Sequence, residues 1–118
     1  MTILIVEDNV TVRRLIRRAI CDVAESIIEC GDGSDAPDAY RIHQPDLVLM
    51  DIRMPGTDGL SATKELTTRF SGARVLILTD YDGEELRSAA MEAGACGYAL
   101  KEDLTVLAEL ISQHTAGV

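Results

Sequence analysis

The sequence predicts a doubly wound α/β fold, in which five parallel strands in the order 2-1-3-4-5 are each followed by a helix. Runs of consecutive apolar residues recur at 3–6, 47–50 and 75–78, which is typical of strands buried on both faces. Segments with helical spacing of apolar residues follow them. This alternation requires a parallel sheet covered by helices on both faces. With no linker or repeat, residues 1–118 are predicted to form one domain.

The first strand, Ile3 to Val6, ends at two acids, Glu7 and Asp8. From Val10 the apolar period becomes helical, and the predicted inward face holds Val12, Leu15, Ile16, Ala19 and Ile20. Four arginines occupy the other face, which we expect to be a solvated charged surface: Arg13, Arg14, Arg17 and Arg18. The first turn of this helix lies beside the acids, where it could contact a partner.

The second strand is predicted at residues 26–30, near an edge of the sheet. The helix that follows has Pro37 in its first turn, where the missing N–H costs little, and runs to about His43. We expect His43 and His114 to lie on the surface.

The third strand ends at Asp51, and Pro55-Gly56 then forces a turn. Thr57 or Asp58 is expected to cap a helix from about Leu60 to Phe70. Ligands of open parallel sheets bind beyond the carboxyl ends of the strands, which is where Asp51 lies. Taken alone, Asp51 is equally consistent with a turn acid that merely ends a strand.

The fourth strand ends at Thr79, and the next helix is predicted to begin at Asp82 or Gly83. Asp82 and Glu85 have the spacing of a capping box, and Gly94 suits the position that follows a helix.

The fifth strand is predicted at residues 96–100 and ends at Lys101. Asp103 is expected to cap a last helix with an apolar face of Leu104, Leu107, Leu110 and Ile111, whereas Val106 could face a partner.

The composition favours a cationic ligand or a basic partner. The net charge is -9 and the sequence pI is about 4.5, which does not suit nucleic-acid binding by this domain. Aromatic residues make up only 3% of the chain, so the core must be aliphatic. We expect Cys21, Cys30 and Cys96 to be small buried thiols in a reducing compartment. The sequence has no signal-peptide pattern and no stretch of membrane-spanning length, so the expected location is the cytoplasm.

Five polar residues directly follow predicted strands: Glu7, Asp8, Asp51, Thr79 and Lys101. In the order 2-1-3-4-5 their strands are neighbours, so the five side chains should converge. Two carboxylates ~4 Å apart repel by about 4 kcal/mol at an effective dielectric of ~20. A divalent cation relieves that repulsion, and an all-oxygen set of ligands suits Mg²⁺.

Asp51 is then a candidate nucleophile that forms an aspartyl-phosphate, with the metal and Lys101 neutralising the transferred group. Thr79 offers a hydroxyl to a phosphoryl oxygen. Considered singly, Thr79 is better explained as a strand-end residue, and Lys101 as a surface lysine with a buried stem.

The chain resembles the receiver domains of two-component response regulators, the CheY-like family. The resemblance rests on residues 5–9, on Asp51 to Pro55 with Asp58-Gly59, on Leu78-Thr79 and on residues 97–101. Residues 79–98 look most like receivers that precede LuxR/NarL-type DNA-binding domains.

The resemblance implies that Asp51 accepts a phosphoryl group from a sensor histidine kinase. It implies Mg²⁺ bound by Asp8, Asp51 and the carbonyl of Arg53, with Glu7 acting through water, and phosphate contacts from Thr79 and Lys101. Thr79 and Tyr98 occupy the family's switch positions, and Arg53 and Tyr81 occupy positions that tune dephosphorylation.

As a signalling domain, the protein would catalyse only its own phosphorylation and dephosphorylation. The face made by the fourth helix, fifth strand and fifth helix would control an output domain or a partner protein, or would bind a second copy on phosphorylation. The expected output is transcription. Direct contact with nucleic acid or a membrane is not expected.

Two residues depart from the family pattern. Glu102 replaces the proline that usually follows the lysine, and Asp80 replaces a small residue after the threonine. A receiver-like interaction module that works without phosphorylation is therefore an alternative. A Mg²⁺-dependent phosphohydrolase and a flavodoxin-type electron carrier are further alternatives, but the sequence lacks the motifs that each requires.

Overall fold

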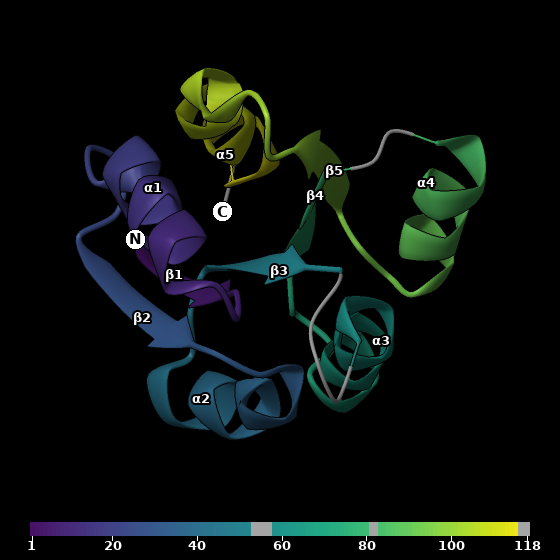
Figure 1. The fold of residues 1–118 in the computed structure, drawn as a ribbon. Helices are drawn as coiled ribbons and strands as arrows, with labels where there is room; N and C mark the ends of the chain where they lie inside the picture. The colour runs from purple at the N-terminus through teal and green to yellow at the C-terminus, as the bar shows by residue number, and fades with distance from the viewer. Residues whose placement is uncertain (53–57, 81–82, 116–118) are drawn as a thin grey trace.

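The computed structural model describes residues 1–52, 58–80 and 83–115 of the 118-residue chain. A five-stranded parallel sheet has the order β2-β1-β3-β4-β5, so the predicted order is confirmed (Figure 1). The strands are β1 (Thr2–Val6), β2 (Ser26–Cys30), β3 (Leu47–Asp51), β4 (Val75–Thr79) and β5 (Gly97–Leu100).

Helices cover both faces of the sheet. They are α1 (Val10–Ile20), α2 (Ala36–His43), α3 (Gly59–Arg69), α4 (Glu84–Glu92) and α5 (Leu107–Thr115), with short 3-10 turns η1 (Gly33–Asp35) and η2 (Leu104–Val106). Helices α1 and α5 pack on one face, and α2, α3 and α4 pack on the other (Figure 1). Within the described residues, no helix combines the length and apolar character needed to cross a bilayer.

The core has two layers because successive strand residues point to opposite faces. In β1, Leu4 and Val6 pack in the layer under α2, α3 and α4. Ile3 and Ile5 pack in the layer under α1 and α5. All four side chains are fully buried, which explains why this strand shows no polar alternation.

Local hydrogen bonds define several helix ends. Asn9 Oδ1 accepts from the Val12 amide at 3.1 Å, and Asp58 Oδ1 accepts from the Ser61 amide at 2.8 Å, which confirms Asp58 as a helix cap. Gly94 follows α4 with a φ of 97°, a conformation that strongly favours glycine.

The beginning of α4 agrees with its prediction, whereas the beginning of α5 differs. Helix α4 is preceded by Gly83, without a side-chain capping bond, and Asp82 lies outside the described residues. The Asp103 side chain does not cap the backbone, and a 3-10 turn leads into α5. Asp103 instead accepts a hydrogen bond from the Thr105 hydroxyl.

The predicted inward face of α1 is partly wrong. Ile16 and Ile20 are buried, but Leu15 is 48% exposed. Ile16 and Ile20 are one turn apart and face the sheet, whereas Leu15 lies about 100° around the helix from Ile16. The inward stripe is therefore narrower than the apolar pattern suggested.

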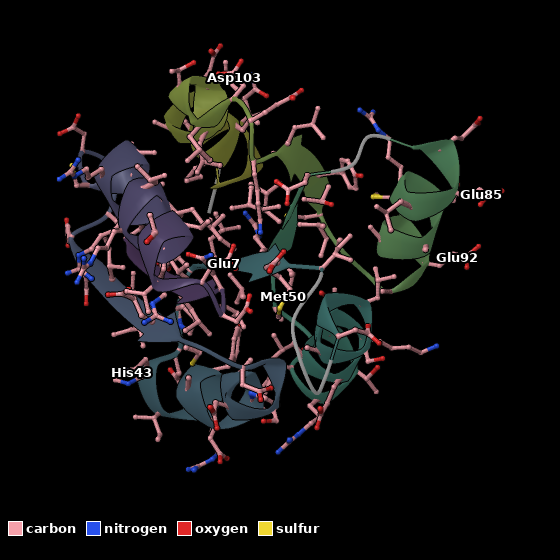
Figure 2. All side chains as sticks on the ribbon, viewed as in Figure 1. Glu7, His43, Met50, Glu85, Glu92 and Asp103 are labelled. Carbon is pink, nitrogen blue, oxygen red and sulfur yellow. The ribbon has the colours of Figure 1, made fainter. Side chains whose placement is uncertain are left out.

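The cysteine prediction is wrong for Cys21, which is exposed directly after α1, while Cys30 is buried and Cys96 is half-buried. His43 is exposed as predicted, and Figure 2 shows it at the periphery while Glu7 and Met50 lie near the middle of the molecule. Val106 is 41% exposed, in agreement with the suggestion that it faces outward.

Candidate functional site

The five predicted polar residues lie at the carboxyl edge of the sheet. Glu7 follows β1 and Asp8 comes next, Asp51 and Thr79 are the last residues of β3 and β4, and Lys101 follows β5. Glu7, Asp51 and Thr79 are 1%, 4% and 2% exposed, whereas Asp8 is open to solvent. The site therefore has a buried floor and one exposed acid.

Lys101 bridges the two buried acids. Its Nζ lies 2.6 Å from Glu7 Oε1 and 2.8 Å from Asp51 Oδ1. The Lys101 amide donates to the Thr79 carbonyl at 2.8 Å, which fixes the start of the lysine's loop against β4. Segments that are almost a hundred residues apart in the chain thus meet through one ammonium group.

Burial raises the pKa of Glu7 from 4.5 to about 7. The close contact with the Lys101 ammonium opposes this rise, and the neighbouring Asp51 adds to it. Burial by itself lowers the pKa of Lys101, but its contacts with Asp51 and Glu7 outweigh burial and the pKa is raised. Lys101 is therefore a stable cation, while Glu7 changes protonation near neutral pH.

The same acids form a candidate cation site. Glu7, Asp8 and Asp51 each offer one carboxylate oxygen, and the three oxygens lie within 4.8 Å of one another. Among the described residues, Glu7 Oε1 is buried and has the ion pair with Lys101 but no partner at hydrogen-bond geometry. This set of oxygen donors fits Mg²⁺. The predicted carbonyl ligand, Arg53, lies outside the described residues.

Gly59 lets α3 approach the site. Its amide donates to the Ile52 carbonyl at 2.8 Å. A Cβ atom at Gly59 would stand 1.9 Å from the Asp51 carbonyl oxygen. The sequence showed Gly59 only as part of a motif, and the reason that glycine is needed appears in this packing.

Arg13 was predicted to lie on a solvated face, and this prediction is wrong. Its side chain is 20% exposed and pairs with Glu29 on β2, and it donates to the Glu7 carbonyl at 2.9 Å. Arg17 pairs with Glu29 as well. The position of Arg13 in the first turn of α1 could have indicated this contact with Glu7, because a side chain in a first helical turn reaches back toward the N-terminus.

The predicted switch residue Tyr98 is half-buried on β5, in contact with the layer under α2, α3 and α4. The Arg87 guanidinium of α4 lies 5.2 Å from the centre of its ring. Asp80 and Glu102, which depart from the family pattern, are exposed. Tyr81, predicted to tune dephosphorylation, lies outside the described residues.

A doubly wound sheet with acids, a threonine and a lysine at its carboxyl edge defines a receiver-type signalling domain. The family model described as "Response regulator receiver domain" matches residues 3–112, and the chain belongs to this family.

The relatives include chemotaxis and transcription regulators. The chain is 37% identical over 99 residues to the chemotaxis protein CheY of Halobacterium salinarum, across 84% of this chain and 82% of that protein. It is 33% identical over 118 residues to the transcriptional regulatory protein DegU of Brevibacillus brevis, across 98% of this chain and 50% of that protein. It therefore spans about half the length of such a transcriptional regulator.

A solved structure gives the same picture. The two-component response regulator of the LuxR family from Aurantimonas sp. SI85-9A1 matches with a TM-score of 0.89 and 34% identity, across 98% of this chain and 85% of that one. The resemblance to receivers, including those of LuxR/NarL-type regulators, is thereby confirmed.

Proposed function

We propose that this receiver domain accepts a phosphoryl group from a histidine kinase on Asp51, in a reaction that depends on Mg²⁺, and thereby controls an output partner. One observation carries the proposal: a buried carboxylate, Asp51, lies 2.8 Å from a lysine and forms a cluster with two further acids that together with it could hold a cation. This arrangement suits an aspartyl nucleophile better than a structural ion pair alone, which would need only one acid.

In the transfer, an Asp51 carboxylate oxygen attacks phosphorus. The bond from phosphorus to the histidine nitrogen breaks, and that nitrogen keeps the electron pair. Thr79 donates its hydroxyl to a phosphoryl oxygen, and Lys101 exchanges its contact with Asp51 for the new phosphate. Glu7, Asp8, Asp51 and the Arg53 carbonyl would hold Mg²⁺, which when bound neutralises charge on the transferred group.

The response follows from the added charge. A phosphate brings about -2 charge and three acceptor oxygens to the strand ends. Thr79 moves toward it, and Tyr98 turns into the space that Thr79 leaves, which alters the face formed by α4, β5 and α5. Arg53 and Tyr81 would set how fast water removes the phosphate. The domain acts only on its own aspartate and turns over no separate substrate.

The output is proposed to be transcription control, through an attached domain, a partner protein or a second copy that binds on phosphorylation. DegU, a relative named as a transcriptional regulator, is about twice as long as the matched region. The location in the cytoplasm and a single receiver domain over residues 1–118 stay predictions.

The deciding experiment is phosphorylation by acetyl phosphate or phosphoramidate with Mg²⁺, read by intact mass. We expect wild type to gain one phosphoryl group and Asp51→Asn to gain none. Asp38→Asn makes the same change at an exposed site on α2 and should leave labelling intact.

Equal labelling of wild type and Asp51→Asn would refute Asp51 as the acceptor. A wild-type protein that never gains mass with excess donor would favour the alternative of an interaction module that works without phosphorylation.

A further inference from the structure

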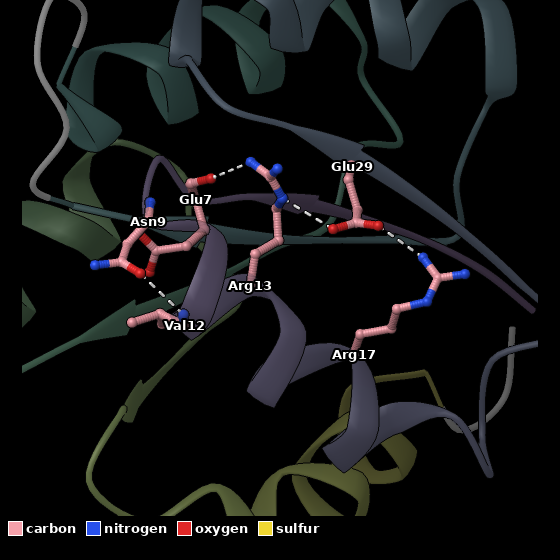
Figure 3. Close-up of polar contacts among 6 residues, drawn as sticks. All are labelled: Glu7, Asn9, Val12, Arg13, Arg17 and Glu29. Carbon is pink, nitrogen blue, oxygen red and sulfur yellow. Dashed lines mark hydrogen bonds and ion pairs between the residues drawn. The ribbon is translucent and has the colours of Figure 1, made fainter.

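Arg13 lies in α1 and reaches back to the loop that carries Glu7 and Asp8 (Figure 3). Its Nη1 donates to the Glu7 carbonyl at 2.9 Å, and its Nε donates to Glu29 Oε1 at 2.9 Å. The planar guanidinium can serve both acceptors at once, because its N–H groups point in fixed directions. Arg13 thus ties the end of β1 to the edge strand β2.

Glu29 holds the guanidinium of Arg13 in place. Glu29 Oε1 accepts from Arg13, and Glu29 Oε2 accepts from Arg17 Nη1 at 2.8 Å. Because both carboxylate oxygens are engaged, the carboxylate presents a fixed edge to Arg13. Figure 3 shows the two arginines converging on Glu29 from successive turns of α1.

The Glu7 backbone is held on both sides at the point where the sheet ends. Its amide donates to the Cys30 carbonyl at 3.0 Å, one residue beyond the β1–β2 pairing. Its carbonyl accepts from Arg13. The Asn9 amide also donates to Glu7 Oε2 at 3.3 Å, so the placement of the backbone and that of the Glu7 carboxylate are linked.

We propose that Arg13 is a positioning residue for the cation site: held by Glu29, it fixes the Glu7 backbone and so sets where Glu7 and Asp8 lie relative to Asp51. This inference rests on the proposed function, because it takes the acid cluster as a Mg²⁺ site. The competing interpretation is an ordinary surface ion pair that adds stability and nothing else.

Arg17 separates the two interpretations. Arg13→Ala and Arg17→Ala each remove one positive charge and one hydrogen bond to Glu29, but only Arg13 contacts the acidic loop. A nearby arginine repels Mg²⁺, so electrostatics alone predicts tighter Mg²⁺ binding when its positive charge is lost. Positioning predicts the opposite sign for Arg13→Ala.

We expect Arg13→Ala to weaken Mg²⁺ binding roughly tenfold, the size usual for groups that orient metal ligands. Arg17→Ala should bind Mg²⁺ at least as tightly as wild type. Arg13→Lys keeps the charge but loses the two-acceptor geometry, so it should also bind weakly. Mg²⁺ is titrated against the whole chain by calorimetry, and circular dichroism checks that each variant is folded.

A second readout needs no metal. In EDTA, hydrogen exchange at the amides of Glu7 and Asn9 should be faster in Arg13→Ala than in Arg17→Ala, because only the former frees the loop. Equal Mg²⁺ affinities and equal exchange in the two alanine variants would overturn this inference and leave Asp51 phosphorylation standing. A wild-type protein that binds no Mg²⁺ would instead remove the cation site itself, and this inference with it.

Discussion

At the scale of single residues, the site is a balance between buried negative charge and one lysine. Three acids meet at the carboxyl edge of the sheet, and Lys101 contacts the two buried ones at 2.6 and 2.8 Å. One cation does not neutralise two carboxylates, so a proton on Glu7 or a second cation completes the balance. Protons and Mg²⁺ should therefore compete at Glu7.

Glu7 gives the metal-free protein a defined pH dependence. The Glu7 pKa is about 7 in the folded state against an ordinary value of 4.5, so folding favours the protonated form. Its contribution to the free energy of unfolding is full below pH 4.5 and is lost as the pH rises to about 7.

We expect Glu7→Gln, which cannot lose a proton, to remove this dependence and to be more stable than wild type above neutral pH. Urea unfolding of both proteins in EDTA, between pH about 5 and about 8, measures how the free energy of unfolding depends on pH. If the stabilities of wild type and variant changed in parallel with pH, Glu7 would not be the titrating group.

At the scale of elements, four of the five strands (β1, β3, β4 and β5) each deliver part of the site, and neighbouring helices hold the ends of β1 and β3. The end of β3 shows this most clearly, because α3 packs directly on the backbone of Asp51 through Gly59. The Asp58 cap and the bond from the Gly59 amide to the Ile52 carbonyl fix the start of that helix. The position of Asp51 thus depends on a backbone contact with Gly59 that leaves no room for a side chain.

Gly59→Ala should disturb both the fold and the site. The added Cβ would lie 1.9 Å from the Asp51 carbonyl oxygen, so α3 or the end of β3 must shift, at a cost of about 1–3 kcal/mol. We expect lower stability by urea unfolding and slower phosphorylation by acetyl phosphate.

Gly72→Ala is the matched control, because a Cβ at Gly72 meets nothing within 4 Å. If the Gly59→Ala variant were phosphorylated at the same rate as the Gly72→Ala variant, the close packing of α3 on the Asp51 backbone would not affect the reactivity of Asp51.

At the scale of the whole molecule, the site and the proposed output face share strand β5. Lys101 follows β5 at the carboxyl edge, and Tyr98 on the same strand packs beneath α4 with the Arg87 guanidinium 5.2 Å from its ring centre. A phosphate on Asp51 that binds Thr79 and Lys101 would therefore displace the ends of β4 and β5, the strands nearest α4 and α5. It must favour the active packing by a few kcal/mol to shift most molecules.

We expect phosphorylation to change hydrogen exchange in α4, β5 and α5, and to leave α2 at its unphosphorylated rate. The reason is that α2 packs over β1 and β2, toward the edge of the sheet opposite β5. Exchange mass spectrometry with and without acetyl phosphate measures this, and Asp51→Asn provides the control. An equal change in α2 and α4 would contradict a switch confined to the α4-β5-α5 face.

Much of this arrangement was predictable from the sequence. The buried strands appear as apolar runs, and the polar residues that end them mark the edge of the sheet. Asp8, Asp51, Thr79 and Lys101 could be proposed as one site because parallel strands bring their carboxyl ends to the same edge.

The places where sequence reasoning failed share a physical cause. Leu15 fits a helical apolar pattern but lies outside the narrow contact stripe of α1. Arg13 has the appearance of a solvated charge, yet a residue on β2 holds it. Periodicity reports which side of an element is apolar, but it does not report what packs against that side.

By itself, therefore, the sequence determined the order of strands and helices, the aliphatic core and the residues that reach the carboxyl edge, because these follow from local periodicity and parallel topology. Only the tertiary structure decided that Lys101 bridges Glu7 and Asp51 and that Arg13 holds the Glu7 backbone. It also decided that the absence of a side chain at Gly59 lets α3 pack against Asp51. The Lys101 contacts join segments distant in the chain, whereas the contacts of Arg13 and Gly59 join a helix to the end of a nearby strand. The geometry of each contact is set by how the helices pack on the sheet.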